Sequence, residues 1–186
     1  LVVGSLVQTL IIVVSIEFGW RRRKELSFRD IGFQQTGIGL LVMVAIAGFV
    51  LAGTIEGIER QLGIKPGDLV PELIAPQGFV WPHFVAVLIT VGVIAPIAEE
   101  MIFRGVLYSW FRSRFNIPLA IFLNAGLFGL IHFGYPLPLM ALVALMGAVF
   151  AWSFERTGSL WVPIVLHIGQ NSAVVIAVYA TLYFQR

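Results

Sequence analysis

The chain has 186 residues, of which 59% are hydrophobic and 12% are charged, with a formal net charge of +2 and a mean hydropathy of +0.93. A soluble domain carries about 25% charged residues, so this composition excludes an ordinary soluble protein and predicts a membrane protein. The small net charge gives no reason to expect a nucleic-acid partner, and the lack of cysteine excludes disulfides, thiol nucleophiles, thiolate metal sites and covalent c-type haem.

Six apolar runs follow one another along the chain. A membrane-spanning helix needs about 20 mostly apolar residues. Each run is close to that length except the fourth, whose shortness leaves open a kink or partial burial. The sequence therefore predicts an all-α, polytopic transmembrane helix bundle with about six spanning helices. The runs cover residues 1–18, 34–55, 79–103, 118–134, 137–154 and 160–184.

The charges between the runs predict their orientation. Arginine and lysine cluster after the first run and again after the third, whereas the connection at 56–78 is acidic. By the positive-inside rule, residues 19–30 and 105–117 lie in the cytoplasm. Residues 56–78 and both termini then lie outside.

Two glycines in the second run have two interpretations. Gly53 and Gly57 are four residues apart, a spacing that lets membrane helices approach closely. Glycine is also common in membrane helices in general. The spacing alone does not choose between these interpretations.

The third run contains the first of three polar motifs. Glu99 and Glu100 are adjacent, and Arg104 follows Glu100 by four residues, so these two share a helix face. A charge at the bilayer centre costs at least about 3 kcal/mol, which makes such residues functional candidates. Pairing keeps Glu100 and Arg104 ionised, and Glu99 is left as a candidate general base. Pro96 predicts a kink beside them, while the alternative is a helix end that reaches the interface.

The other two motifs lie on later runs. Phe128 and His132 share a helix face, and so do His167 and Asn171. A histidine beside an aromatic ring is often only a core residue. The second pair lies inside the last run and must face protein or water. Its alternative role is an interhelical hydrogen bond that holds the bundle together.

A predicted hairpin brings the motifs together. With a turn near Asn116, Glu99 lies 17 positions before the turn and His132 lies 16 after it. The equal rise of both helices places these two residues at one depth. His167 lies in the run that next enters from the same cytoplasmic side, and it comes level with them if the arm with Arg112 and Arg114 extends beyond the membrane. One intramembrane site then holds Glu99, Glu100, Arg104, His132, His167 and Asn171.

The residue types limit the chemistry of such a site. No HExxH motif and no serine in a nucleophile elbow is present, and Asp30 and Asp68 lie outside the apolar runs, which excludes a membrane aspartyl dyad. A glutamate with a histidine can activate water, and a second histidine with an asparagine can stabilise an oxyanion. The competing arrangement is Zn²⁺ held by His132, His167 and Glu99.

These motifs also resemble a known family. In this order, they are similar to those of the CPBP (CAAX protease and bacteriocin-processing) intramembrane glutamic endopeptidases, which include the CAAX prenyl endopeptidases. The resemblance covers about residues 85–180 and implies a catalytic helix core at 79–186. Residues 1–78 would form N-terminal transmembrane helices and an extracytoplasmic connection. The segments that carry the resemblance are Glu99-Glu100-xxx-Arg104, Phe128-xxx-His132, Gly158-Ser159-Leu160-Trp161-Val162-Pro163 and His167-xxx-Asn171.

The resemblance implies a role for each motif residue. Glu99 and His132 would activate water, Glu100 and Arg104 would orient or support that base, and Phe128 would support the site. No cofactor would be needed.

His167 and Asn171 would form the oxyanion site. Substrates would be peptides or lipidated proteins in the bilayer, since eukaryotic members remove the last three residues of prenylated CAAX proteins. Many bacterial relatives have unknown substrates or are linked to bacteriocin immunity. The expected location is a bacterial plasma membrane, with several passes.

Two alternatives use the same residues. A transport or binding protein would use the buried polar site for protons or ions without cleaving anything. A b-type haem protein would use His132 and His167 as axial ligands, which leaves the glutamates without a role.

Overall fold

The computed structural model describes residues 2–61, 63 and 74–185. Within those ranges the regular elements are all helices, which confirms the predicted all-α class. The helices are α1 (Val2–Val14), α2 (Ile38–Gln61), α4 (Trp81–Val87), α5 (Ala95–Glu100), α6 (Ser109–Arg112), α7 (Ile117–Leu130), α8 (Leu137–Thr157) and α9 (Trp161–Phe184). Three π-helical segments (Ser15–Arg21, Leu88–Ile94 and Met101–Tyr108) and a 3₁₀ turn (Arg22–Lys24) continue some of them.

Five helical stretches of the described chain are long and apolar enough to cross a membrane, so the protein is a multi-pass membrane protein. The run predicted at 118–134 forms the shorter helix α7, with 14 residues. Its length of about 21 Å falls short of the ~30 Å hydrocarbon core. The run predicted at 79–103 is longer than expected, because the helix continues past its charged motif. The five stretches are Val2–Lys24, Ile38–Gln61, Trp81–Arg112, Leu137–Thr157 and Trp161–Phe184.

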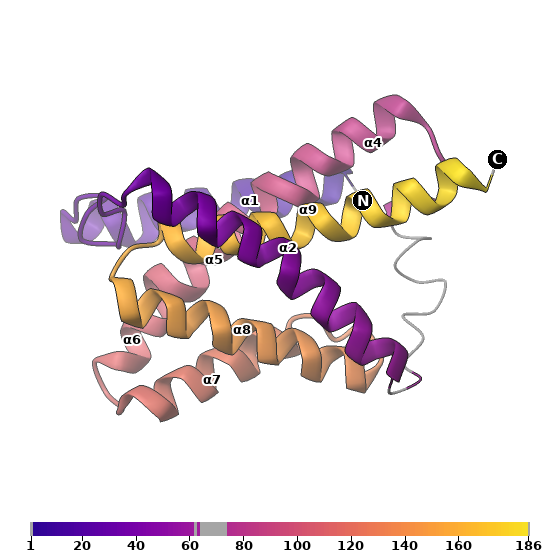
Figure 1. Cartoon of the computed structure of the whole chain (residues 1–186). Coiled ribbons are helices and arrows are strands. Elements are labelled where there is room, and N and C mark those ends of the chain that lie inside the picture. The colour runs from indigo at the N-terminus through magenta and orange to yellow at the C-terminus, as the bar shows by residue number, and fades with distance from the viewer. Residues whose placement is uncertain (1, 62, 64–73, 186) are drawn as a thin grey trace.

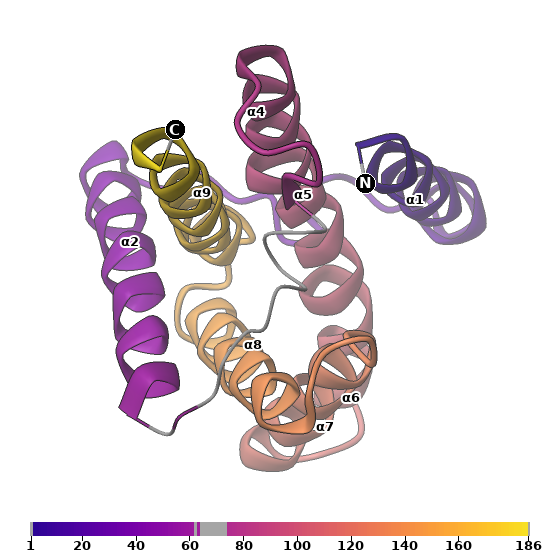
Figure 2. The same ribbon diagram turned by 90° about the vertical axis from the view of Figure 1, so that its right-hand side faces the viewer.

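Helix α9 occupies the middle of the bundle. It lies between α2 and the long helix formed by α4, α5 and α6, while α7 and α8 lie together below them (Figure 2). Helix α1 lies at the outer edge and packs mainly against the long helix. The two termini lie at one end, and the connections after α1, α6 and α8 lie at the other (Figure 1). The segments predicted as cytoplasmic therefore share one end of the bundle.

Helices α2 and α9 touch through glycines. A Cβ added to Gly48 would lie 2.3 Å from the carbonyl oxygen of Leu166, and one added to Gly169 would lie 2.6 Å from that of Ala45. Only glycine permits this approach of two backbones. Gly53 and Gly57, by contrast, have open space around them. A close helix contact at those two positions is therefore wrong, and the interpretation as ordinary membrane-helix glycines stands.

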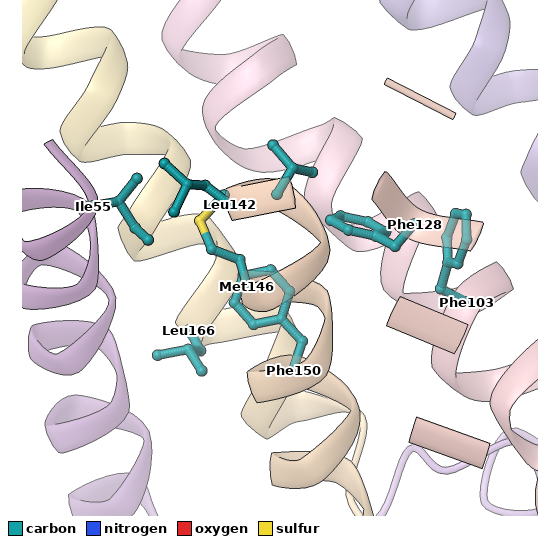
Figure 3. Packing of buried hydrophobic residues seen from close by; sticks show 8 residues of the cluster. Ile55, Phe103, Phe128, Leu142, Met146, Phe150 and Leu166 are labelled. Carbon is teal, nitrogen blue, oxygen red and sulfur yellow. The ribbon is translucent and has the colours of Figure 1, made fainter. Parts of the chain in front are cut away.

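An apolar cluster joins the helices around the polar motifs. It draws on α2, the long helix, α7, α8 and α9, so side chains far apart in sequence pack together (Figure 3). Glycines again allow close packing, since a Cβ on Gly147 would press on the ring of Phe128. The cluster surrounds the motifs with a nonpolar medium of low dielectric. Its members are Ile55, Phe103, Phe128, Leu142, Val143, Met146, Phe150 and Leu166.

Candidate active site

Pro96 shapes the helix that carries the two glutamates. It has no N–H to donate to the preceding turn, where Val91 and Gly92 supply carbonyls. Two side chains of α9 replace the missing donor: Asn171 Nδ2 donates to the carbonyl of Val91 at 3.1 Å, and Ser172 Oγ donates to that of Gly92 at 3.4 Å. The helix runs on through Pro96, from Trp81 to Arg112, and the kink stays a prediction. On both sides of α5 lie π-helical segments, a form that is frequent at functional sites.

Glu100 and Arg104 form the buried ion pair that their spacing predicts. Arg104 Nη1 donates to Glu100 Oε1 at 2.7 Å, and both side chains are 0% exposed. Arg104 Nη2 donates to the carbonyl of Gly147 on α8 at 2.8 Å. The rings of Phe128 and Phe150 lie 4.7 and 5.3 Å from the guanidinium carbon. Pairing, a backbone acceptor and aromatic faces together offset the cost of burying this charge.

His167 is attached to the same carboxylate. Its Nδ1 donates to Glu100 Oε1 at 2.8 Å, and its ring stacks on Phe150 with centroids 4.6 Å apart. Because Nδ1 carries a proton toward Glu100, Nε2 is the atom left to act. That Nε2 lies 3.9 Å from Glu99 Oε2, a gap that one water can bridge.

His132 is held by the end of α7. The N–H of His132 donates to the carbonyl of Gly129, so the carbonyl of Phe128 accepts from the imidazole Nδ1 instead, at 2.8 Å. The acceptor fixes the proton of a neutral ring on Nδ1 and leaves a lone pair on Nε2. The Phe128 ring lies against both imidazoles, 5.2 Å from His132 and 5.8 Å from His167.

Glu99 differs from its neighbour Glu100 in access. The side chain of Glu99 is 15% exposed, while that of Glu100 is fully buried. Both imidazoles, His132 and His167, act electrostatically on the Glu99 carboxylate. The structure therefore brings five of the six predicted polar residues into one cluster. The five are Glu99, Glu100, Arg104, His132 and His167.

Asn171 reaches the cluster only indirectly. One amide hydrogen is used by the Val91 carbonyl, as described above, so the contact that the structure shows for Asn171 is with the turn before Pro96 in the long helix. The amide has a second hydrogen that this contact does not use. Asn171 thus already has the structural role that its alternative interpretation predicted, a hydrogen bond between helices.

Sequence patterns missed several groups that complete the site. Phe150 and the carbonyl of Gly147 come from α8, which carries none of the three motifs. Asn124 is 0% exposed and donates from Nδ2 to the carbonyl of Phe103. Tyr135 lies with its ring 5.7 Å from that of His132. Of these, Asn124 is the one that the sequence indicated, because it extends the helix face shared by Phe128 and His132.

The donor set does not fit a metal ion in this arrangement. Among residues 2–61, 63 and 74–185, no three histidine, aspartate or glutamate side chains converge closely enough to hold one. His167 directs Nδ1 to Glu100 and stands 3.9 Å from Glu99. No step through zinc follows from this geometry.

Comparison with known proteins identifies similar sequences. Residues 81–173 match the family model described as "Type II CAAX prenyl endopeptidase Rce1-like". The chain is 31% identical over 145 residues to "Putative membrane peptidase YdiL" of Bacillus subtilis, covering 77% of this chain and 59% of that protein. It is 27% identical over 134 residues to an "Uncharacterized 24.3 kDa protein" of Escherichia coli, covering 70% of this chain and 58% of that protein.

The matched region contains all three polar motifs. The chain spans about three-fifths of the length of these curated relatives. No solved structure matches significantly.

Proposed function

We propose that this chain, which belongs to the type II CAAX prenyl endopeptidase Rce1-like family, is an intramembrane peptidase that uses an activated water. One observation carries the proposal: the buried Glu100 accepts hydrogen bonds from both Arg104 and His167 at Oε1, while Glu99 stays accessible 3.9 Å from His167 Nε2. This leaves one carboxylate as support and one as base. Two neighbouring carboxyl groups with unequal surroundings are suited to unequal roles.

The first step adds water to the scissile carbonyl. Glu99 removes a proton from the water, the oxygen bonds to the carbonyl carbon, and the carbonyl oxygen becomes an oxyanion. His132 presents an Nε2 lone pair, because its Nδ1 proton is held by the Phe128 carbonyl. That lone pair accepts the second hydrogen bond of the same water, which fixes its orientation.

Two groups donate hydrogen bonds to the oxyanion. His167 as an imidazolium donates from Nε2, while its Nδ1 stays on Glu100, whose carboxylate stabilises the positive ring. The second amide hydrogen of Asn171 is the other donor. Collapse breaks the C–N bond, and Glu99 returns its proton to the departing amine. The products are a carboxylic acid and an amine, and no covalent intermediate forms.

The substrates proposed are peptides or lipidated proteins held in the bilayer, including CAAX-like sequences. The description of the matching family, which names prenylated CAAX substrates, supports this class. The buried position of the site among membrane-spanning helices favours substrates that are themselves attached to the membrane. The two relatives are bacterial, which supports a bacterial plasma membrane as the location.

A comparison of membrane peptides tests the proposal. Mass spectrometry of membranes from cells with the parent protein and with Glu99→Ala should show cleavage products in the parent alone. Glu56→Ala, which changes an exposed glutamate on α2 paired with Arg60, is the matched control and should keep the products. Identical peptide sets in parent and Glu99→Ala cells contradict the proposal. Proton flux by the purified parent in liposomes, without any product, would support the transport alternative, and a Soret band would support the haem alternative.

A further inference from the structure

A tight turn follows α7 and holds two rings together. The N–H of Tyr135 donates to the carbonyl of His132 at 2.9 Å, which closes the turn. The two rings lie 5.7 Å apart with their planes inclined by 33°. Tyr135 therefore has a fixed place beside His132, although the two residues do not share a helix face.

The turn directs its apolar and polar side chains in opposite directions. Phe133 is 84% exposed and Ile131 is 46% exposed, as lipid-facing residues are. His132 and Tyr135 are only partly exposed, and Tyr135 packs against the apolar cluster of the core. The ring of Tyr135 thus lies between the core cluster and the His132 imidazole, while its hydroxyl is not fully buried.

The hydroxyl of Tyr135 is a donor without an acceptor. In the part of the chain that the structure describes, it makes no hydrogen bond within the protein, and it is not one of the fully buried unpaired atoms, so it keeps accessible surface through which a water or a carboxylate can reach it. The Glu99 carboxylate acts on it electrostatically. Burial, and secondarily this carboxylate, raises the pKa of Tyr135, so the hydroxyl keeps its proton at neutral pH.

The surroundings of Glu99 leave room for such a donor. Glu100 receives hydrogen bonds from both Arg104 and His167. Glu99 has no partner closer than His167 Nε2, at 3.9 Å, within the described ranges. The charged and titratable groups that act on Glu99 are His167, His132, Glu100, Arg104 and Tyr135.

We propose that Tyr135 is a positioning residue of this site, whose hydroxyl donates to the Glu99 carboxylate, directly or through the water held there. The proposal rests on the proposed function, since it makes Tyr135 act through the general base. The turn supplies the placement, and the unpaired hydroxyl supplies the hydrogen bond. Tyr135 would stabilise the ionised form of Glu99 and fix the direction of its oxygens.

Infrared difference spectroscopy tests this independently of any substrate. In the detergent-solubilised protein, the Glu99 carboxyl band is the one that disappears in Glu99→Gln. Tyr135→Phe keeps the ring and removes the donor, so the pH at which this band titrates should rise by about one to two units, the size of a hydrogen bond to a charged group. Tyr108→Phe is the matched control, because that phenol donates to Glu155 instead, at 2.7 Å. An unchanged titration in Tyr135→Phe overturns the proposal.

Two further measurements separate positioning from packing. Cleavage of a quenched fluorescent farnesylated peptide ending in a CAAX sequence should show a lower kcat for Tyr135→Phe with KM unchanged, and the acid limb of its pH profile should move upward. Tyr135→Leu removes ring and donor together. If only the leucine variant alters the Glu99 titration, the ring acts by packing and the proposal fails. A parent protein that cleaves no peptide leaves the infrared result intact, so failure of the proposed function is distinguished from failure of this inference.

Discussion

Glu100 and His167, 67 residues apart in the chain, share a hydrogen bond of 2.8 Å between Oε1 and Nδ1. The same oxygen accepts from Arg104 at 2.7 Å. One carboxylate oxygen thus links the long helix to α9, and its neighbour Glu99 stays free of such links. This inequality between adjacent glutamates leads to the first prediction.

Replacing the accessible glutamate should abolish turnover without unfolding the protein. Glu99→Gln keeps the size of the side chain but cannot take a proton from water, and general-base catalysis contributes about 10²–10⁴ in rate. We expect kcat against a farnesylated CAAX peptide to fall by about that factor. The circular dichroism melting curve should match the parent.

The control for this substitution is Glu56→Gln. Glu56 is also a helical glutamate, but it is exposed and paired only with Arg60. The Glu56→Gln protein should cleave the peptide at the parental rate. Parental activity in Glu99→Gln would remove Glu99 from the mechanism.

Arg104 should be essential for stability. Arg104→Met leaves the buried Glu100 with His167 as its remaining hydrogen-bond partner, and breaking a buried pair costs about 3–5 kcal/mol. The free energy of unfolding in detergent, measured by denaturant titration, should fall by that amount. The double variant Arg104→Met/Glu100→Gln removes the unpaired charge and should recover part of the loss. Additive effects of the two single substitutions would contradict a coupled pair.

The contact between α2 and α9 should not tolerate a methyl group. Gly48→Ala would place a carbon 2.3 Å from the Leu166 carbonyl oxygen, so the helices must separate. Overpacking of this kind costs about 1–3 kcal/mol. Unfolding in detergent should show this loss.

Gly53→Ala is the matched control on the same helix. It meets open space, and alanine favours helix over glycine by about 1 kcal/mol. It should therefore be neutral or stabilising. Equal melting temperatures for the Gly48→Ala and Gly53→Ala proteins would show that the two backbones do not touch.

Chelation should leave cleavage unaffected, because the mechanism proposed above uses only side chains. The rate against the farnesylated peptide, measured after dialysis against a strong chelator, should equal the untreated rate. A zinc peptidase treated in parallel should lose its activity. Loss of cleavage that added Zn²⁺ restores would instead support the arrangement of His132, His167 and Glu99 around a metal ion.

Local spacing explains what the sequence predicts well. Glu100 with Arg104, and Phe128 with His132, are four residues apart, and a helix brings such pairs together whatever the rest of the fold does. The equal chain lengths on both sides of Asn116 predict the common depth of Glu99 and His132, which both belong to the cluster that the structure shows. The helical class follows from the apolar runs alone.

The spacing of residues along the chain does not predict contacts between distant segments. The bond of His167 to Glu100 depends on how α9 lies on the long helix, which no periodicity reports. Tyr135 lies in a turn, where helix faces do not apply. Gly48 looks like any membrane-helix glycine, since its importance comes from the backbone opposite. The predicted roles of the six motif residues and the boundary at residue 78 stay predictions.

The side-chain hydrogen bonds beside Pro96 tie α9 to the long helix. If α9 slid or turned against the long helix, the carbonyls of Val91 and Gly92 would lose Asn171 and Ser172 as donors, and a lost hydrogen bond is costly inside a membrane protein. Those two helices therefore move as one body. The α7–α8 hairpin, which supplies His132, is held to this body by the hydrogen bond from Arg104 to the Gly147 carbonyl and by the stacking of Phe150 on His167.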